Sequence, residues 1–232
     1  MELKTIARIY CDLETKFGVP RQSGVAPHLC GEIVFEKEWR DKNAFKGIEK
    51  FSHLWIIWGF SEGFSGRDKT HQWSPTVRPP ILGGNERIGV FATRSPNRPN
   101  PLGLTSVKLE AVDLNTKDGP VLYVSGIDMM NQTPIYDIKP YLPYADIKSN
   151  ASGGFTDTQS FRRLDVTYSD DAMKHLSDKL TDTQITALTE ILSNNPNPQY
   201  ISASDRQYGL SYAGLNIIFN IVDDKVYGSR VD

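Results

Sequence analysis

The sequence predicts a mainly β protein, with a single-sheet β-barrel as its N-terminal domain and a small α+β domain after it. Many short runs of β-branched and aromatic residues, separated by turn residues, fill the first part of the chain and leave few helical periods. Longer runs of apolar residues at helical spacing follow a stretch rich in serine and glycine. We therefore expect two domains, at 1–146 and 147–232.

The first half of the barrel is expected to hold three strands. Residues 3–10 alternate loosely between polar and apolar types, which favours a strand, and a second strand is expected at 31–35 after a turn-rich segment. A short helix is expected over 39–48. Residues 54–60 are rich in β-branched and aromatic types, so they predict a strand that is buried.

The second half of the barrel is expected to hold three more strands. They are predicted at 88–93, 105–114 and 121–127. Turn residues at 115–120 predict that the last two strands form a hairpin. Short strands in this number are typical of a closed sheet and not of a doubly wound one.

The C-terminal part has a different pattern. A linker is expected at 149–154, and apolar residues at helical spacing predict a helix over 169–192. That helix should break where Thr181 or Asp182 could cap a second helix. Residues 215–227 form two apolar runs around a pair of aspartates, which predicts a hairpin.

The composition is that of an ordinary globular protein, with 39% hydrophobic and 23% charged residues. The most apolar run, at 54–60, is too short to span a bilayer, and no signal peptide is evident, so we expect a cytoplasmic protein that does not enter a membrane. Cys11 and Cys30 have neither metal-type nor redox spacing, and we expect two free thiols. The four histidines form no ligand pattern, so no metal is expected.

The formal net charge is −2, which does not indicate a strongly basic nucleic-acid binder. A local patch, however, matters more than the total. Lysine and arginine gather between residues 67 and 98, whereas aspartates gather in the C-terminal part. This distribution is consistent with RNA contact by the N-terminal domain only.

The segment 87–104 is the most informative part of the chain. It ends in a loop that combines three prolines with Arg94 and Arg98. Proline restricts the backbone, so the loop has little conformational freedom to lose on binding, and arginine presents a rigid fork of donors to phosphates or carboxylates. The loop is therefore expected to clamp a ligand, although alone it could be a proline-rich surface turn.

Six motifs occur in one order along the first 144 residues. They are Pro-Arg-Gln at 20–22, Phe-Ser-His-Leu-Trp at 51–55, Arg-Pro-Pro at 78–80, Gly-Val-Phe-Ala-Thr-Arg-Ser at 89–95, Arg-Pro-Asn-Pro at 98–101 and Asp-Ile-Lys-Pro-Tyr at 137–141. In this order and spacing the chain resembles the TsaA-like family, which includes the TrmO-type tRNA methyltransferases. Several motifs in register are far more specific than any one of them.

The resemblance implies an enzyme that transfers a methyl group from S-adenosylmethionine to N6 of threonylcarbamoyladenosine, next to the anticodon of tRNA. It also implies a homodimer with the donor bound by barrel loops near the subunit interface. The positions that correspond to the family's donor-binding segments are Pro20, Arg21, Gln22, Ser61, Glu62, Arg94, Asn131, Gln132, Thr133 and Pro134. At two of these places the chain departs from the family pattern, which has a His-Gln-like pair at 61–62 and Asp-Gly-Thr-Pro at 131–134. Arg21 or Arg94 could pair with the methionine carboxylate.

The same resemblance suggests where the tRNA binds and which group accepts a proton. Candidate substrate-binding residues are Arg78, Arg98, Asn100, Lys139 and Tyr141. Asp137 is the candidate general base, although a structural role at a strand end is equally open for it. For Asp128 the role of a turn carboxylate is favoured. Tyr136 or Tyr141 could hold the sulfonium by cation–π attraction, with Asp128 or Asp137 nearby.

Two other functions stay open at this point. The barrel could bind S-adenosylmethionine as a sensor or adaptor without catalysis, or it could methylate a different acceptor. No G-x-G-x-x-G follows a strand, so the Rossmann route to this donor has no support.

Overall fold

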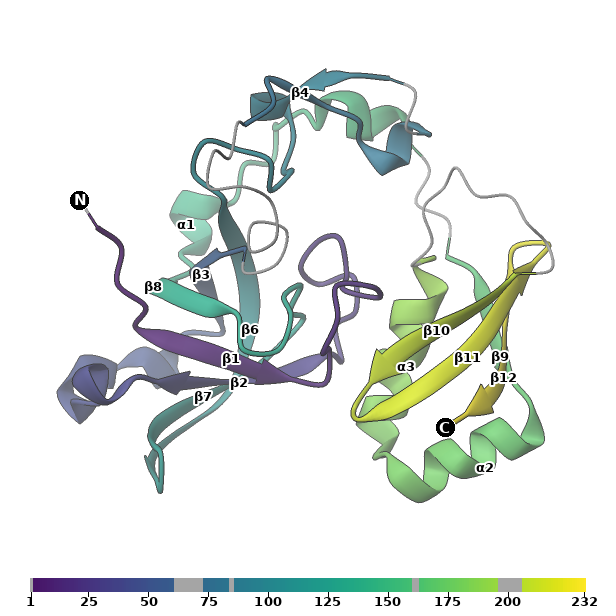
Figure 1. The fold of residues 1–232 in the computed structure, drawn as a ribbon. Helices are drawn as coiled ribbons and strands as arrows, with labels where there is room; N and C mark the ends of the chain where they lie inside the picture. Colours follow the sequence, from purple (N-terminus) through teal and green to yellow (C-terminus); the bar gives the residue numbers. More distant parts are fainter. Residues whose placement is uncertain (1, 61–72, 84–85, 160–162, 196–205) are drawn as a thin grey trace.

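The computed structural model describes residues 2–60, 73–83, 86–159, 163–195 and 206–232, and the statements below concern those residues. Six antiparallel strands close into a barrel in the order β1-β2-β7-β6-β3-β8 (Figure 1). They are β1 (Ala7–Cys11), β2 (Cys30–Phe35), β3 (His53–Gly59), β6 (Leu102–Thr116), β7 (Gly119–Ser125) and β8 (Pro134–Pro140). This closed sheet confirms the predicted fold class.

The barrel interior is filled by alternate side chains of its strands. Ile9, Ile33, Leu54, Ile56 and Leu122 are fully buried, as period-two alternation requires for strands with one face inward. Each such side chain contributes roughly 1.5–3 kcal/mol when it is removed from water. The barrel is therefore a packed core and not a channel.

The strand that closes the barrel, β8, was not among the predicted strands. It pairs with β3 along most of its length and with β1 through only two residue pairs, Ala7 with Ile135 and Arg8 with Pro134. Strand prediction relies on alternating polar and apolar residues. In β8 this pattern is interrupted by a proline at each end and by the charged residues Asp137 and Lys139. Its strand character comes from its neighbours.

The helix predicted over 39–48 is wrong, because the chain forms three separate 3₁₀ turns there. They are η1 (Lys37–Trp39), η2 (Lys42–Phe45) and η3 (Ile48–Lys50). The Asp41 side chain accepts a hydrogen bond from the backbone of Asn43 and starts a new turn, and Gly47 has a φ of 94°. A left-handed residue ends a helical run.

A segment that we call the arch (residues 73–83 and 86–101) rises from the barrel between β3 and β6 (Figure 1). It contains β4 (Thr76–Val77), η4 (Pro80–Leu82), β5 (Ile88–Gly89) and η5 (Val90–Ala92), and β4 pairs only with β5. The strand predicted at 88–93 therefore ends early. The hydroxyl and the backbone N–H of Thr93 both donate to the carbonyl of Val90, which turns the chain away from extended backbone.

The chain then passes through α1 (Pro143–Asp146) and η6 (Gly154–Thr158) to a C-terminal sheet of order β10-β11-β12-β9. Its strands are β9 (Asp165–Tyr168), β10 (Gln207–Tyr212), β11 (Leu215–Val222) and β12 (Lys225–Val231), and two helices, α2 (Asp170–Lys179) and α3 (Asp182–Ser193), precede β10. None of the described helices is long and apolar enough to cross a membrane.

Two local predictions for this part are confirmed. The helical segment breaks before Thr181, which caps α3 in a reciprocal capping box with Gln184. Asp223 and Asp224, with φ values of 46° and 60°, form the turn of the β11–β12 hairpin. β9 and β10 were not predicted.

The barrel and the C-terminal part pack against each other. The imidazole of His28 lies 2.7 Å from a carboxylate oxygen of Glu190 on α3, and the Gln184 side chain donates to Asp12. A Cβ on Gly18 would lie 2.3 Å from a terminal methyl of Leu210, and the φ of 91° at this position also favours glycine. Division of the chain at residue 146 stays a prediction.

Candidate functional site

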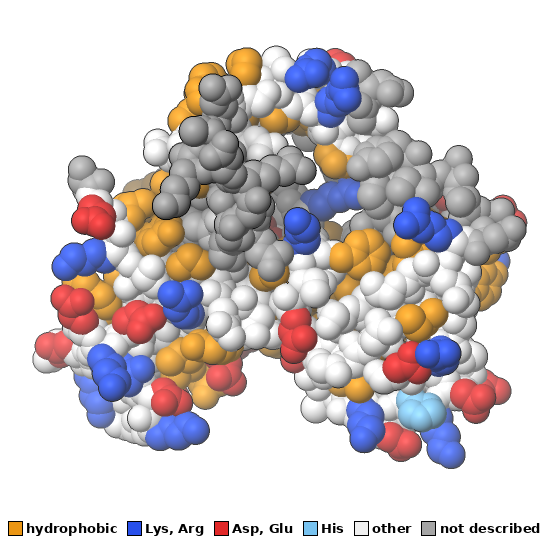
Figure 2. Space-filling model, viewed as in Figure 1, with side chains coloured by type: hydrophobic (Ala, Val, Ile, Leu, Met, Phe, Trp, Pro, Cys, Tyr) orange, Lys and Arg blue, Asp and Glu red, His pale blue; other side chains and the backbone are white. Residues whose placement is uncertain are grey.

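Two loops that are far apart in the sequence meet beside the barrel. The guanidinium of Arg94 donates to the side-chain oxygen of Gln22 over 2.5 Å, and both side chains are exposed. In the view of Figure 2 the molecule is hollowed between the barrel, the arch and the C-terminal sheet, and Lys and Arg side chains lie beside the hollow. The fold thus joins two residues that were predicted to bind the methyl donor.

A half-buried carboxyl group, Asp128, lies close to Arg94. The hydroxyl of Thr105 donates to Asp128 over 2.7 Å, and the indole N–H of Trp58 donates to that same hydroxyl over 2.8 Å. Burial raises the pKa of Asp128 from 3.8 to about 6, and the Thr105 hydrogen bond and the positive charge of Arg94 oppose this rise. A carboxyl group with this pKa can gain or lose a proton near neutral pH.

The barrel wall is shaped to hold this chain of hydrogen bonds. Trp58 and Thr105 are both buried, on neighbouring strands β3 and β6. A Cβ on Gly103 would lie 2.1 Å from the Trp58 ring, so glycine is needed for the indole to lie flat against β6. The indole N–H donates to the Thr105 oxygen, which leaves the hydroxyl proton for Asp128.

Arg98 holds the loop that presents Arg94. Its guanidinium donates to the carbonyl of Thr93 over 2.7 Å and to that of Val90 over 3.3 Å, and it lies 5.9 Å from the centre of the Phe91 ring. Sequence analysis assigned Arg98 to substrate contact. In the structure it shapes the arch loop from inside.

Pro20 and Arg21 line a pocket of about 340 Å³ between the two parts of the chain. Its other walls come from residues 16–19 and from the end of α3 with the residues that follow it. Pro20 is buried and Arg21 is exposed. The predicted donor-binding motif is therefore divided: Pro20 and Arg21 line the pocket, whereas Gln22 binds Arg94 of the arch.

The predicted binding segment at 131–134 forms the turn into β8. The side-chain oxygen of Asn131 accepts from the backbone of Cys11, and Gln132 has a φ of 62° with its carbonyl bound by Arg8. Thr133 is buried and Pro134 begins β8. The hydrogen bonds of this segment join β1 to β8, and its side chains do not reach Arg94 through any hydrogen bond in the described part of the chain.

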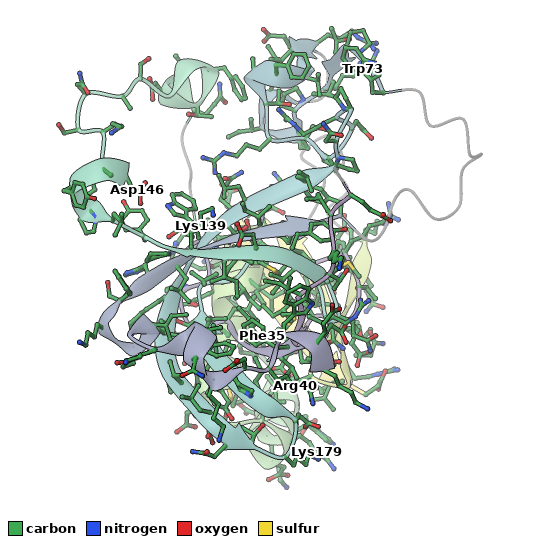
Figure 3. All side chains as sticks on the ribbon, turned by 90° about the vertical axis from the view of Figure 1, so that its left-hand side faces the viewer. Phe35, Arg40, Trp73, Lys139, Asp146 and Lys179 are labelled. Atoms are coloured by element: carbon green, nitrogen blue, oxygen red, sulfur yellow. The ribbon has the colours of Figure 1, made fainter. Side chains whose placement is uncertain are left out.

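Asp137, Lys139 and Tyr141 lie on the outer side of the barrel. The Asp137 carboxylate pairs with Lys139 over 2.8 Å and accepts from the backbone of Ile138, and its side chain is 46% exposed. Tyr141 packs 5.6 Å from the ring of Trp55, whose N–H binds Asp146. Figure 3 shows Lys139 and Asp146 on this side, below Trp73 of the arch.

The remaining predicted residues have simple surroundings. Arg78 is exposed in the arch directly before the buried Pro79. Asn100 has an exposed side chain, and its carbonyl accepts from the backbone of Leu102. Ser61 and Glu62 lie outside the described residues. Among the described residues no group of histidine, cysteine or carboxylate side chains could hold a metal ion, and Cys11 and Cys30 are free.

The sequence did not predict the chain of hydrogen bonds that runs from Trp58 through Thr105 to Asp128. The one available signal was the position of Asp128 directly after the apolar run 121–127. Nothing in that run indicates that the carboxyl group meets a threonine on β6 and a tryptophan on β3. Only the closed barrel brings these residues together.

Comparison with known proteins identifies the family. A model of the tRNA-methyltransferase O N-terminal domain matches residues 8–147. The tRNA (adenine(37)-N6)-methyltransferase of Escherichia coli K12 is 34% identical over 226 residues, which cover 96% of this chain and 94% of that protein. The protein of the same name from Eikenella corrodens is 37% identical over 171 residues, which cover 74% of this chain and 91% of that protein.

Solved structures agree as well. The crystal structure of TrmO from Pseudomonas aeruginosa matches 100% of this chain and 98% of that chain, with a TM-score of 0.75 and 26% identity. The family resemblance predicted from the six motifs is thus confirmed by a family model, by relatives of nearly full length and by the fold. The chain belongs to the tRNA-methyltransferase O family.

Proposed function

We propose that this protein transfers a methyl group from S-adenosylmethionine to N6 of threonylcarbamoyladenosine at position 37 of tRNA. The observation that carries the proposal is the cluster of Arg94, Gln22 and Asp128, which lies where the family motifs meet. The relatives named as tRNA (adenine(37)-N6)-methyltransferases support the reaction and its position in tRNA. A methyl donor supplies an electrophilic methyl group on a sulfonium, so the protein mainly has to align two molecules.

The residues of the cluster fit the chemistry of this donor. Its methionine part carries a carboxylate, which the Arg94 guanidinium can bind through two parallel hydrogen bonds once Gln22 releases it. The Gln22 amide has both a donor and an acceptor for the adenine edge. The negative charge of Asp128 suits a ligand that carries an ammonium and a sulfonium.

Asp128 also suits the proton that must leave the acceptor nitrogen. In threonylcarbamoyladenosine this nitrogen is conjugated to a carbonyl, so it is a poor nucleophile until it loses its proton. A carboxyl group with a pKa of about 6 is mostly ionised at pH 7 and is still basic enough to accept that proton. Asp137, expected from its motif, is the second candidate.

We also propose a homodimer in the cytoplasm, where a tRNA substrate is found. An apolar strip on the outer side of the barrel supports the dimer. Leu104 is 58% exposed and Leu102 is 37% exposed, and they pair across β6 and β3 with Ile57 and Gly59. A strip of this kind is typical of a surface that a second copy covers.

The test is methylation of two transcripts of one tRNA, with and without threonylcarbamoyladenosine, followed by nucleoside mass spectrometry. We expect one added methyl group on the modified tRNA only. Equal methylation of both tRNAs would contradict the modified base as substrate. Donor binding without methylation of either would favour a sensor.

Arg94→Ala tests the donor site within this function. The loss of a charge-assisted hydrogen bond should weaken binding of S-adenosylmethionine by about 1.5–3 kcal/mol, which is more than tenfold. Arg87→Ala is the matched control, since that side chain binds Thr76 inside the arch. Calorimetry that found equal affinities for all three proteins would remove Arg94 from the donor site.

A further inference from the structure

Two aromatic rings stand exposed on the arch and have no role in the site described above. Phe91 is 72% exposed and Trp73 is 42% exposed. Their ring centres are 5.9 Å apart and their planes differ by 32° (Trp73 is labelled in Figure 3). We call this pair the aromatic platform.

The platform is held by the backbone beneath it. The N–H of Val90 donates to the carbonyl of Pro75 over 2.9 Å, which ties the segment of Trp73 to that of Phe91. Arg98 binds two carbonyls of the same turn and lies 5.9 Å from the Phe91 ring. Large apolar side chains that are fixed in place and left exposed indicate a binding surface.

The charge around the platform indicates the kind of ligand. Among the described arch residues there are four arginines, Arg78, Arg87, Arg94 and Arg98, and one acidic residue, Glu86. An aromatic surface inside a cationic segment is suited to single-stranded nucleic acid, because bases stack on the rings while arginines attract the phosphates.

The position of Phe91 relates the platform to the proposed reaction. It precedes Arg94 by three residues, so their Cα atoms can lie at most about 11 Å apart. A base that is stacked on Phe91 is therefore within reach of a nucleotide whose target atom lies at Arg94 and Asp128.

We propose that Trp73 and Phe91 stack an unpaired base that neighbours the target adenosine in the anticodon loop. This inference rests on the proposed function, because it assigns part of the same tRNA to the arch. The platform holds the loop in an open form, with the neighbour stacked and the target base free to enter the site. Phe91 is a positioning residue in this arrangement.

The experiment uses an anticodon stem–loop RNA that carries threonylcarbamoyladenosine at position 37. Phe91→Ala should weaken its binding roughly 5- to 150-fold, as expected for one lost stacking contact. Phe91→Trp should restore binding, and affinity for S-adenosylmethionine should stay unchanged. Tyr144→Ala is the matched control, because this ring is 86% exposed on α1, outside the arch.

A second arm removes the base instead of the ring. Stem–loops that are abasic on one or the other side of position 37 are bound to the wild type and to Phe91→Ala. For one of the two abasic RNAs, the wild type should bind as weakly as Phe91→Ala binds the intact RNA. Phe91→Ala should bind that abasic RNA no more weakly still, because the contact is already lost. Fully additive losses at both positions would overturn the proposal.

Two more outcomes separate the possible failures. If Phe91→Ala turned the dimer into monomers in sedimentation, the platform would belong to a subunit interface and the proposal would be overturned. If the wild type bound the stem–loop through Phe91 but transferred no methyl group, the platform would stand and the proposed function would fail.

Discussion

Two carboxylates on opposite sides of the barrel wall have opposite environments. Asp128 is half-buried and receives a hydrogen bond from Thr105 inside the wall. Asp137 lies outside, exposed and paired with Lys139. Burial raises the pKa of Asp128 to about 6.

The comparison teaches that residue type and motif do not decide which carboxylate can do acid–base chemistry. Both residues are aspartates, but Asp128 follows the end of β7 and Asp137 lies in the middle of β8. Their difference is burial, since the Asp128 carboxyl meets the hydroxyl of the buried Thr105 whereas the Asp137 carboxylate is largely exposed to water beside Lys139. We therefore expect substitutions at the two positions to have different effects.

The largest expected difference is in catalysis. Asp128→Asn should lower kcat for methylation of the modified tRNA by about 10²- to 10⁴-fold, because an amide cannot accept the proton. Asp137→Asn should lower kcat less than about tenfold. Single-turnover kinetics with both variants provides the measurement, and the reverse order would assign the proton to Asp137.

The second difference is in the pH dependence of stability. In the folded chain Asp128 keeps its proton up to a pKa of about 6, whereas its ordinary value is 3.8, so the folded state binds more protons between these values. The wild type should therefore lose about 2–3 kcal/mol of stability, relative to Asp128→Asn, as the pH rises from 4 to 8.

Urea denaturation at pH 4, 6 and 8 measures this difference. Asp128→Asn should be the more stable protein at pH 8 although it is the less active one. Asp137→Asn is the control for the loss of a carboxylate from the outer side of the barrel. Parallel curves for all three proteins would mean that Asp128 is solvated.

The smallest expected effect is in the stability of the outer ion pair. Both partners, Asp137 and Lys139, are substantially exposed. Exposed pairs contribute about 0–1 kcal/mol, so Lys139→Ala should change the free energy of unfolding by no more than about 1 kcal/mol. A larger loss would show that the ion pair stabilises the barrel. It would also weaken the contrast between the exposed Asp137 and the half-buried Asp128.

Several features were predictable because they depend on residues that are close in the sequence. The cap at Thr181 and the turn at Asp223 and Asp224 follow from local hydrogen bonds and backbone preferences. The buried strand at 54–60 follows from its apolar and β-branched residues. The six motifs were enough to predict the family.

Other features were not predictable because they depend on which strands become neighbours. The strand β8 has a weak pattern of its own and forms because β3 and β1 offer it hydrogen-bonding edges. The 3₁₀ turns at 37–50 replace a helix because side-chain hydrogen bonds and Gly47 interrupt it. Such competition between local and distant contacts is decided only in the folded chain.

By itself the sequence determined the mainly β class, the capped helices and the cationic, proline-rich loop that carries Arg94. The tertiary structure decided that Arg98 shapes this loop and that Asp128 meets Thr105 and Trp58. The reason is physical. The charge and donors of a side chain are fixed by its covalent structure, whereas its pKa and partners depend on burial and on contacts that only the closed barrel creates.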